Sequence, residues 1–441
     1  MIKRNQNGFL ISTILISLLY LVMGYFIPRE ESWGLLSTFT LLFIFTSFNL
    51  KKASLKSILI QGLIFRCILL FSLPWLSQDF YRFIWDGLML NHHLNPYAYF
   101  PNELQEMSSL FNPQLKSELL KNMGDLSAQH YSNYPPLNQL GFWLSTIWFP
   151  NSILLTVICM RLIIICADIG LFFTLKNILP KLGLETNRIG WYFLNPLVII
   201  ELTGNLHWEG VMLFFFSVGM GYYLSKKLFR STLFFSFSVA IKLIPLLLLP
   251  LFLRVQAYKK SVLMGVYGLG CLLIMFVPFF IDIGLNNYLN TLKLWFKNFE
   301  FNGSIYYLIR WGGYQVKGYN IIRQLGEVMP WIITSLVILF SFWKSKKTMN
   351  QVFTAMLMLL TCYYGLASIV HPWYVINLVF LCLFTNFRYP LIWSALVPFS
   401  YITYANPMFQ ENFYLIGIEY GLVYAILFYE LFKKKPLFQH F

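Results

Sequence analysis

The sequence predicts an all-α integral membrane protein, a multi-span helical bundle with a long polar loop carrying interfacial helices on one side. The 441-residue chain is 58% hydrophobic, and its mean hydropathy is +0.61. Only 12% of its residues are charged, whereas soluble domains carry about 25%. Apolar runs of roughly 15 to 25 residues recur along the chain and match a bilayer core of about 30 Å.

The net charge and the cysteines argue against two other classes of protein. The formal net charge is +15, but the lysines and arginines gather in short loops between apolar runs, which is the positive-inside pattern. We therefore expect no nucleic-acid partner. The six cysteines fall within apolar runs, so neither a disulfide framework nor a zinc site is indicated. No metal or other cofactor is expected.

Basic residues set the expected direction of each apolar run. Lys3 and Arg4 precede the first run and place the N-terminus in the cytoplasm. That run is longer than a signal-peptide core and is expected to remain as a transmembrane helix. We expect about twelve crossings, which are Phe9–Ile27, Trp33–Asn49, Ile58–Leu76, Ser152–Leu175, Ile189–Thr203, Glu209–Ser225, Ser261–Ile281, Met329–Trp343, Gln351–Ile369, Trp373–Phe387, Tyr389–Tyr404 and Phe413–Phe432.

Two further apolar segments are expected to enter the membrane without crossing it. Pro136–Pro150 is short and starts at a Pro-Pro pair, and a full crossing there would put the next basic residues outside. Ser231–Leu253 is interrupted by Lys242 and Pro245 and has basic residues at its far end, so we expect a helical hairpin. Such partial segments are tolerated at membrane depth when they are buried in protein.

This path makes the chain one membrane domain, residues 1–441, with both termini in the cytoplasm. No linker, internal repeat or block of charge divides it. Its chemically rich segments then share the extracytoplasmic face. They are a first outer loop of residues 77–135, the span end Asn205–Glu209, a second outer loop of residues 284–328, and His371.

The first outer loop opens with an unusual density of charge. Asp79 and Asp86 lie seven residues apart, which on a helix is about two turns, and both share a face with Arg82. A carboxylate at a membrane boundary that faces a cavity can act as a general base. Alternatively, the three residues form a solvated ladder on a helix at the headgroup level. The spacing alone leaves both interpretations open.

Other polar residues also admit two interpretations. Lys242, inside an apolar run, either reaches a lipid phosphate or extends to the cytoplasmic surface. Arg310 and Arg323 are rival candidates for the phosphate. His207 and Glu209 are two residues apart and do not share a helix face, which argues against a metal site built from them alone. They either line a polar cavity or mark a helix boundary.

Short motifs then point to a family. The run QDFYRFIWDG, followed by LNPYAYFP, resembles the first outer loop of bacterial polyprenyl-phosphate-sugar-dependent glycosyltransferases of the GT-C superfamily, especially the mannosyltransferase-like ones. Those proteins start this run with an acidic pair, whereas here Gln78 stands in the first position and Asp79 in the second. Weaker similar pieces follow in the family's order: YPPLNQ, LNPLVIIELTGNLHWEG, AIKLIPLLLLP, FNGSIYYLIR and HPWY.

The resemblance implies a GT-C-type membrane enzyme with its site at the extracytoplasmic face of the cell (inner) membrane. It implies inverting transfer of a sugar, expected to be mannose, from a polyprenyl phosphate to a hydroxyl of a glycan, lipid or protein acceptor. Asp79 takes the position of the general base. Arg82 and Asp86 would organise the loop. Either Lys242 or Arg310 would hold the donor phosphate. The expected sugar or acceptor pocket contains His93, Tyr134, Asn205, His207, Glu209, Asn302, His371 and Tyr374.

Two other functions compete with the enzyme. A transporter or flippase for lipid-linked glycans would place charges along a path between both faces, often with repeat symmetry. Neither an internal repeat nor charges along the inner half are evident in the sequence. A structural partner within an envelope-glycan complex is the third option. A folded but inactive Asp79→Asn variant would favour the enzyme over both.

Overall fold

The protein is almost entirely helical. Its computed structural model describes residues 2–51, 53–107, 111–255, 257–280, 284–342, 348–406 and 408–433. Within these residues there are twenty α-helices and no β-strand, and the pairing of extended backbone is limited to an isolated bridge between Phe301 and Ile369. The prediction of an all-α protein is confirmed.

The helices differ widely in length. The longer ones are α1 (Ile2–Tyr25), α2 (Ser32–Leu50), α3 (Leu55–Ile68), α4 (Asp79–Asn91), α5 (Pro113–Ala128), α6 (Pro136–Thr146), α7 (Ile153–Ile178), α10 (Glu209–Leu224), α11 (Leu228–Ile241), α13 (Tyr258–Phe280), α14 (Gly284–Asn298), α15 (Ile305–Lys317), α16 (Ile322–Phe342), α17 (Met349–Leu366) and α20 (Phe413–Lys433). The shorter ones are α8 (Gly190–Phe193), α9 (Pro196–Val198), α12 (Pro245–Leu248), α18 (Val375–Cys382) and α19 (Tyr389–Leu396). Between them lie the 3-10 helices η1 (Pro101–Leu104), η2 (Pro180–Leu182), η3 (Thr186–Ile189), η5 (Leu249–Arg254), η6 (Pro372–Tyr374) and η7 (Val397–Ala405), and the π-helix η4 (Ile199–Gly204).

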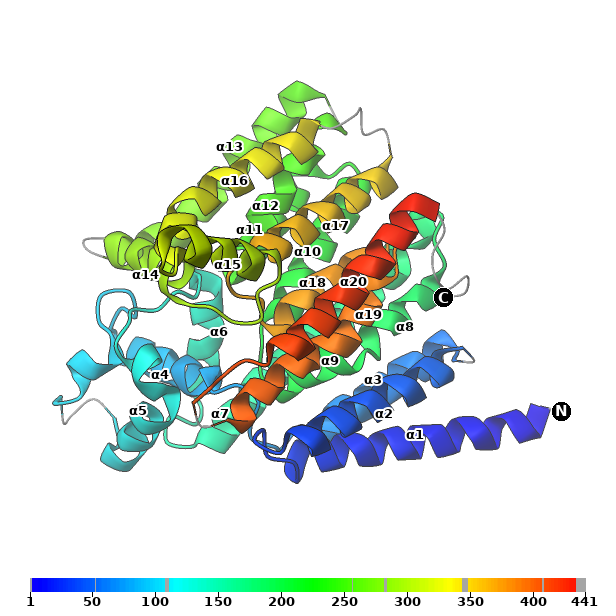
Figure 1. Ribbon diagram of the computed structural model, residues 1–441, viewed down its shortest axis with the longest axis horizontal. Helices are drawn as coiled ribbons and strands as arrows, with labels where there is room; N and C mark the ends of the chain where they lie inside the picture. Colours follow the sequence, from blue (N-terminus) through cyan, green and yellow to red (C-terminus); the bar gives the residue numbers. More distant parts are fainter. Residues whose placement is uncertain are drawn as a thin grey trace.

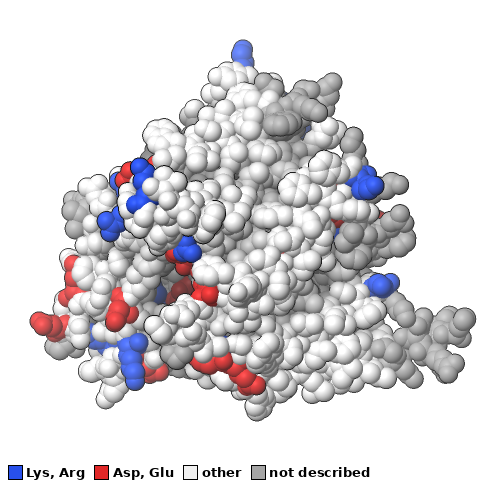
Figure 2. All heavy atoms as spheres, viewed as in Figure 1, with Lys and Arg blue, Asp and Glu red and all other residues white. Residues whose placement is uncertain are grey.

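The long helices form a bundle with distinct ends. In Figure 1, α2, α3, α16, α17 and α20 run in similar directions, from lower left to upper right. Helices α4, α5, α14 and α15 gather on the left, whereas α1 begins and α20 ends on the right. Most acidic side chains visible in Figure 2 lie on the left, over the α4–α5 and α14–α15 regions. On this face of the molecule the acidic side chains are thus concentrated toward one end of the bundle.

Several helices are suited to a lipid environment. Five are long and apolar enough to cross a membrane by length and composition, namely α2, α7, α13, α16 and α20. Helix α13 is the clearest, since Leu263, Val266 and Ile274 are each 65% or more exposed. Such a large exposed apolar surface is unfavourable in water and favourable in hydrocarbon. The chain is thus a helical membrane protein, and the number of about twelve crossings stays a prediction.

Most predicted spans coincide with helices, but four are interrupted. In Trp373–Phe387 the α-helix α18 covers only eight residues, and Tyr389–Tyr404 is α19 followed by the 3-10 helix η7. The expected span Ile189–Thr203 is a series of short pieces, α8, α9 and η4, because Pro196 follows Asn195, which caps α9 with its side chain. The expected span Ile58–Leu76 ends as a helix at Ile68. Hydropathy reports burial in apolar surroundings and carries little information on where such a segment turns.

Neither of the two partial segments is one long helix, and their path through the membrane stays a prediction. Helix α6 is only 11 residues long, too short to cross a bilayer core. Helix α11 ends at Ile241, because Lys242 has an extended backbone (φ −148°, ψ 145°) and Pro245 starts α12. The basic residues Lys52, Lys344, Lys346, Lys347, Lys434 and Lys435, which were used to orient the chain, lie outside the described residues.

Candidate active site

Helix α4 places Asp79 at its first position. The Asp79 backbone N–H donates to Ser77 Oγ (3.3 Å), which helps to satisfy a helix N-terminus. Asp79 is partly exposed, whereas Phe80 and most of the helix beyond it are buried. The side chain therefore stands at the edge of the packed interior, where a substrate can reach it.

Arg82 and Asp86 fasten the first outer loop. Arg82 Nε donates to Asp86 Oδ1 (2.6 Å), and its Nη1 donates to the carbonyls of Ser127 (2.6 Å) and His130 (2.8 Å). Gln139 Nε2 donates to the other oxygen of Asp86 (2.9 Å). Asp86 is fully buried, so these contacts tie α4 to both the end of α5 and the start of α6.

Helices α10 and α11 bring a second charged pair to the same place. Glu209 is the first residue of α10, and Lys242 directly follows α11. The Lys242 ammonium forms an ion pair with Glu209 Oε1, and the Glu209 carboxylate is fully buried. Helix α11 ends at Ile241, so Lys242 does not take the direction that the next helical residue would have. This change of direction allows its ammonium to reach Glu209.

The charges of this pair act on Asp79. Burial raises the pKa of Asp79 to about 6, while the Lys242 ammonium and the Ser77 hydroxyl lower it and the Glu209 carboxylate raises it. The Asp79 charge in turn affects the Tyr134 and Tyr374 phenols. Asp79, Glu209, Lys242, Tyr134 and Tyr374 thus form one electrostatic cluster, which we call the charged cluster.

Glu201 extends the cluster and was not singled out from the sequence. It lies in the π-helix η4 and is fully buried. It accepts hydrogen bonds from the Tyr401 hydroxyl and from Asn205 Nδ2 (3.3 Å), and His207 Nε2 lies 3.5 Å from its second oxygen. A carboxylate inside the apolar run IIELTG was the signal available in the sequence, because such groups mark functional or networked positions in membrane proteins.

A column of stacked rings lines the cluster. His207 stacks on Trp373 with ring centroids 3.7 Å apart, and Trp373 stacks on His371 at 4.3 Å. The opposite side of His371 faces Phe301 at 5.0 Å. Burial and the Lys242 charge lower the pKa of His371 to about 3 and lower that of His207 well below its ordinary value. Both imidazoles are therefore neutral at pH 7.

Three residues predicted to bind the sugar or the phosphate lie outside the charged cluster, its extension at Glu201 and the ring column. His93 follows α4, fourteen residues after Asp79, so α4 separates the two by about 20 Å; its side chain is exposed. Asn302 is fully buried, with its Nδ2 donating to Glu419 Oε1 (3.2 Å). Arg310 pairs with Glu300, and its guanidinium carbon lies over the Tyr307 ring, 4.4 Å from the ring centroid.

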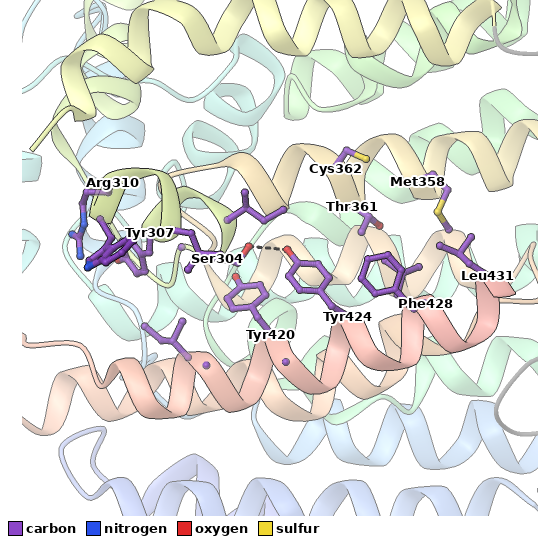
Figure 3. A pocket seen from close by; sticks show the side chains of 18 of the residues that line it. Ser304, Tyr307, Arg310, Met358, Thr361, Cys362, Tyr420, Tyr424, Phe428 and Leu431 are labelled. Atoms are coloured by element: carbon purple, nitrogen blue, oxygen red, sulfur yellow. Dashed lines mark hydrogen bonds between the residues drawn. The ribbon is translucent and has the colours of Figure 1, made fainter. Parts of the chain in front are cut away.

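A long apolar groove begins beside Arg310. It has a volume of about 1370 Å³ and is lined by residues of α15, α17 and α20. Figure 3 shows Arg310 and Tyr307 at one end and Phe428 and Leu431 at the other. Near the Arg310 end, the Ser304 and Tyr424 hydroxyls are hydrogen-bonded (2.8 Å). Because Ser304 follows Phe301 closely in the chain, this end of the groove adjoins the ring column.

Comparison with protein families finds a match that includes this region. A family model described as alpha-(1->6)-mannopyranosyltransferase, N-terminal domain, matches residues 10–258, more than half of the chain. No curated protein matches the chain. The matched part includes Asp79, Glu209 and Lys242. Among the described residues, no group of three or more His, Cys, Asp and Glu side chains is arranged to hold a metal ion.

Proposed function

The chain belongs to the alpha-(1->6)-mannopyranosyltransferase family, and from that premise we propose that it transfers mannose from a polyprenyl phosphate to an acceptor hydroxyl. We further propose that it is a GT-C-type enzyme of the cell envelope, that the transfer inverts the anomeric configuration, and that the reaction takes place at the extracytoplasmic face. The acceptor hydroxyl would belong to a glycan, a lipid or a protein.

One observation carries the proposal: Asp79 is the accessible carboxylate of the charged cluster. Glu209 and Glu201 are fully buried and already have partners, whereas Asp79 is partly exposed. A pKa of about 6 leaves this carboxylate ionised at neutral pH and still basic enough to accept a proton. Efficient general bases have pKa values near the working pH.

The reaction then follows from the positions of these groups. Asp79 accepts the proton of the acceptor hydroxyl as its oxygen attacks the anomeric carbon. The bond between that carbon and the phosphate oxygen breaks, and its electron pair leaves with the polyprenyl phosphate. Attack on the side opposite the leaving group inverts the configuration. The phosphate gains negative charge as it leaves, and a nearby cation stabilises that charge.

Of the two candidate phosphate ligands, the geometry favours Lys242. Its ammonium lowers the pKa values of Asp79, His207 and His371, so it lies beside the base and the ring column. Arg310 lies at the mouth of the groove and is bonded to Glu300. We propose that Lys242 binds the phosphate and that Arg310 shapes the groove entrance.

The groove supports a lipid-linked donor. Its walls are formed mostly by apolar side chains of membrane helices, and a soluble nucleotide sugar would gain little from them. Its volume exceeds the roughly 300 to 1,000 Å³ of pockets for drug-sized molecules. A polyprenyl chain that enters from the bilayer along α17 and α20 would bring its phosphate toward the ring column and the charged cluster.

The deciding experiment is a transfer assay with purified protein. Synthetic polyprenyl-phosphate mannose is incubated with candidate glycan and lipid acceptors, and the products are identified by mass spectrometry. We expect the wild-type protein to form a mannosylated acceptor. The Asp79→Asn variant should be slower by about 10²- to 10⁴-fold, the usual contribution of a general base.

The matched control is Asp125→Asn, which removes an exposed carboxylate of α5 in the same loop. It should retain wild-type turnover. Full activity of Asp79→Asn would refute the assigned base. Movement of intact mannosyl lipid across liposomes without any new glycosidic product would favour the transporter instead.

A further inference from the structure

Asn138 of α6 is a buried amide that the protein itself does not use. Its side chain is fully buried, and within the described residues neither Oδ1 nor Nδ2 has a hydrogen-bond partner. Buried polar groups are nearly always hydrogen-bonded, and leaving both ends of an amide without a partner is unfavourable. An apolar residue of similar size would fit such a position better unless the amide binds something else.

The direction of this amide follows from its neighbours on α6. A Cβ at Gly141 would lie 2.3 Å from the Trp208 ring, and the Phe142 ring is 5.4 Å from Trp208. Successive residues are about 100° apart around a helix. Viewed along the helix axis, Asn138 therefore lies between Gly141 and Phe142, and it is one turn closer to the start of α6. Its side chain faces the loop that leads through Trp208 into Glu209.

The level of the amide along the bundle follows from the packing of α6 on α4. The Phe83 and Phe142 rings are stacked at 4.5 Å, and further along, Asn91 Nδ2 donates to Thr146 Oγ1 (3.2 Å). The two helices thus run in the same direction, and a Cβ at Gly87 of α4 would lie 2.6 Å from the Phe142 carbonyl oxygen. One turn back from this contact, Phe83 and Asn138 lie at the same level, and Asp79 lies one further turn along α4.

Other polar atoms around the charged cluster share this property. Within the described residues, Glu209 Oε2, His371 Nδ1 and the Trp208 indole nitrogen are buried and have no hydrogen-bond partner. Glu209 and His371 come from two different parts of the chain and both lie beside Lys242. A region surrounded by such groups is suited to a ligand with many hydroxyls, which can donate and accept hydrogen bonds on several sides.

We propose that Asn138 binds the hydroxyl groups of the transferred hexose and forms part of a polyol subsite beside Asp79. A carboxamide offers an acceptor oxygen and two N–H donors, which match two neighbouring hydroxyls of a pyranose ring. It carries no charge, so it suits the neutral sugar better than the phosphate. This inference rests on the proposed function, because the sugar is the donor's transferred group.

The test separates binding of the sugar from binding of the lipid. Purified wild-type, Asn138→Leu and Asn138→Ala proteins are titrated with polyprenyl-phosphate mannose and with polyprenyl phosphate alone. Loss of two hydrogen bonds should weaken binding of the mannosyl lipid about tenfold or more. Binding of polyprenyl phosphate should stay unchanged. The thermal midpoint of Asn138→Leu should equal or exceed that of the wild type, because no internal hydrogen bond is lost.

Tyr20→Phe is the matched control. It removes another buried hydroxyl with no partner among the described residues, on α1 where the ring packs against Phe65. We expect it to leave both affinities unchanged. The subsite is overturned if the two Asn138 variants bind both lipids like the wild type, lose both affinities equally or fail to fold. It is also overturned if the wild type binds the two lipids equally well. Sugar-dependent binding without transfer would count against the proposed function alone.

Discussion

Asp79 and Lys242 illustrate how one residue sets the chemistry of another. The lysine lowers the pKa of the aspartate, and Glu209 raises it. The two members of the Lys242–Glu209 ion pair therefore have opposite effects on the same carboxylate. Binding of a phosphate beside Lys242 would add negative charge and raise the pKa of Asp79 further. The base would then be most effective when the donor is in place.

The pH dependence of transfer should report this arrangement. Asp79 must be ionised to accept a proton, and its pKa is raised from 3.8 to about 6. Below pH 6 the protonated fraction grows, so kcat/KM should fall about tenfold for each pH unit in the acid limb. Above pH 6 this limb should become flat. Initial rates of mannosyl transfer between pH 4.5 and 8 would measure the midpoint.

Two substitutions should move that midpoint in opposite directions. Lys242→Met removes a charge that lowers the pKa of Asp79, so the acid limb should move to higher pH. Glu209→Gln removes a charge that raises it, so the limb should move to lower pH. Lys293→Met, on the exposed surface of α14, is the control and should leave the midpoint in place. Shifts in the same direction for the first two variants would contradict the assignment.

Sequence reasoning identified several members of this region but not their partners. Asp79 and His371 stand out as polar residues at the edges of apolar runs, and Lys242 stands out as a charge inside one. Lys242 and Glu209 are 33 residues apart, and their pairing depends on where α11 ends. Glu201 and Asn138 were overlooked because each lies inside an apolar stretch as an ordinary polar residue. Their importance becomes visible only from burial and from the presence or absence of partners.

At the scale of elements, the α17–α20 pair matters most for the donor. Its apolar runs were predicted within a few residues as Gln351–Ile369 and Phe413–Phe432, and the helices are Met349–Leu366 and Phe413–Lys433. The groove between them could not be predicted, because it depends on small residues of α20 that leave open space beside α15 and α17, which come from distant parts of the chain. Gly417 and Gly421 line it.

Filling the groove should weaken use of the lipid-linked donor. A Cβ at Gly421 would meet nothing within 4 Å, so Gly421→Phe can place its ring in the groove without disturbing the helix. Each buried methylene of a lipid chain contributes about 0.8 kcal/mol, and displacing about two of them would raise KM for a long-chain donor about tenfold. A donor with a short prenyl chain should be affected less. Both KM values follow from initial transfer rates.

The control for this variant is Gly270→Phe. Gly270 of α13 also has nothing within 4 Å of its Cβ position, but it does not line the groove. It should leave KM unchanged. Cys362 gives an independent measurement, because this exposed thiol lines the groove. Polyprenyl phosphate should slow its modification by a maleimide while the exposed thiols Cys67 and Cys166 react at their usual rates. Equal rates at all three thiols would argue against an occupied groove.

At the scale of the whole molecule, the candidate general base lies at one end of the helical bundle. Asp79 begins α4, which lies with α5 at one end of the bundle, and the long apolar helices α16 and α20 run away from that end (Figure 1). Composition and positive-inside reasoning predicted the membrane class and this separation. They could not give the number of crossings, because segments such as α8 and α9 are buried by protein and need not be long enough to span lipid.

Labelling of single cysteines should establish which side of the membrane this end faces. In a variant without the six native cysteines, Gln129→Cys adds an exposed thiol after α5, and Lys227→Cys adds one beyond α10. Helix α10 has 16 residues, so it carries the chain about 24 Å away from Glu209. We expect an impermeant maleimide to label position 129 in intact spheroplasts and position 227 only after permeabilisation. The cysteine-free parent should stay unlabelled. The reverse pattern would put Asp79 on the cytoplasmic side, where nucleotide sugars are available, and would remove the physical reason for a lipid-linked donor.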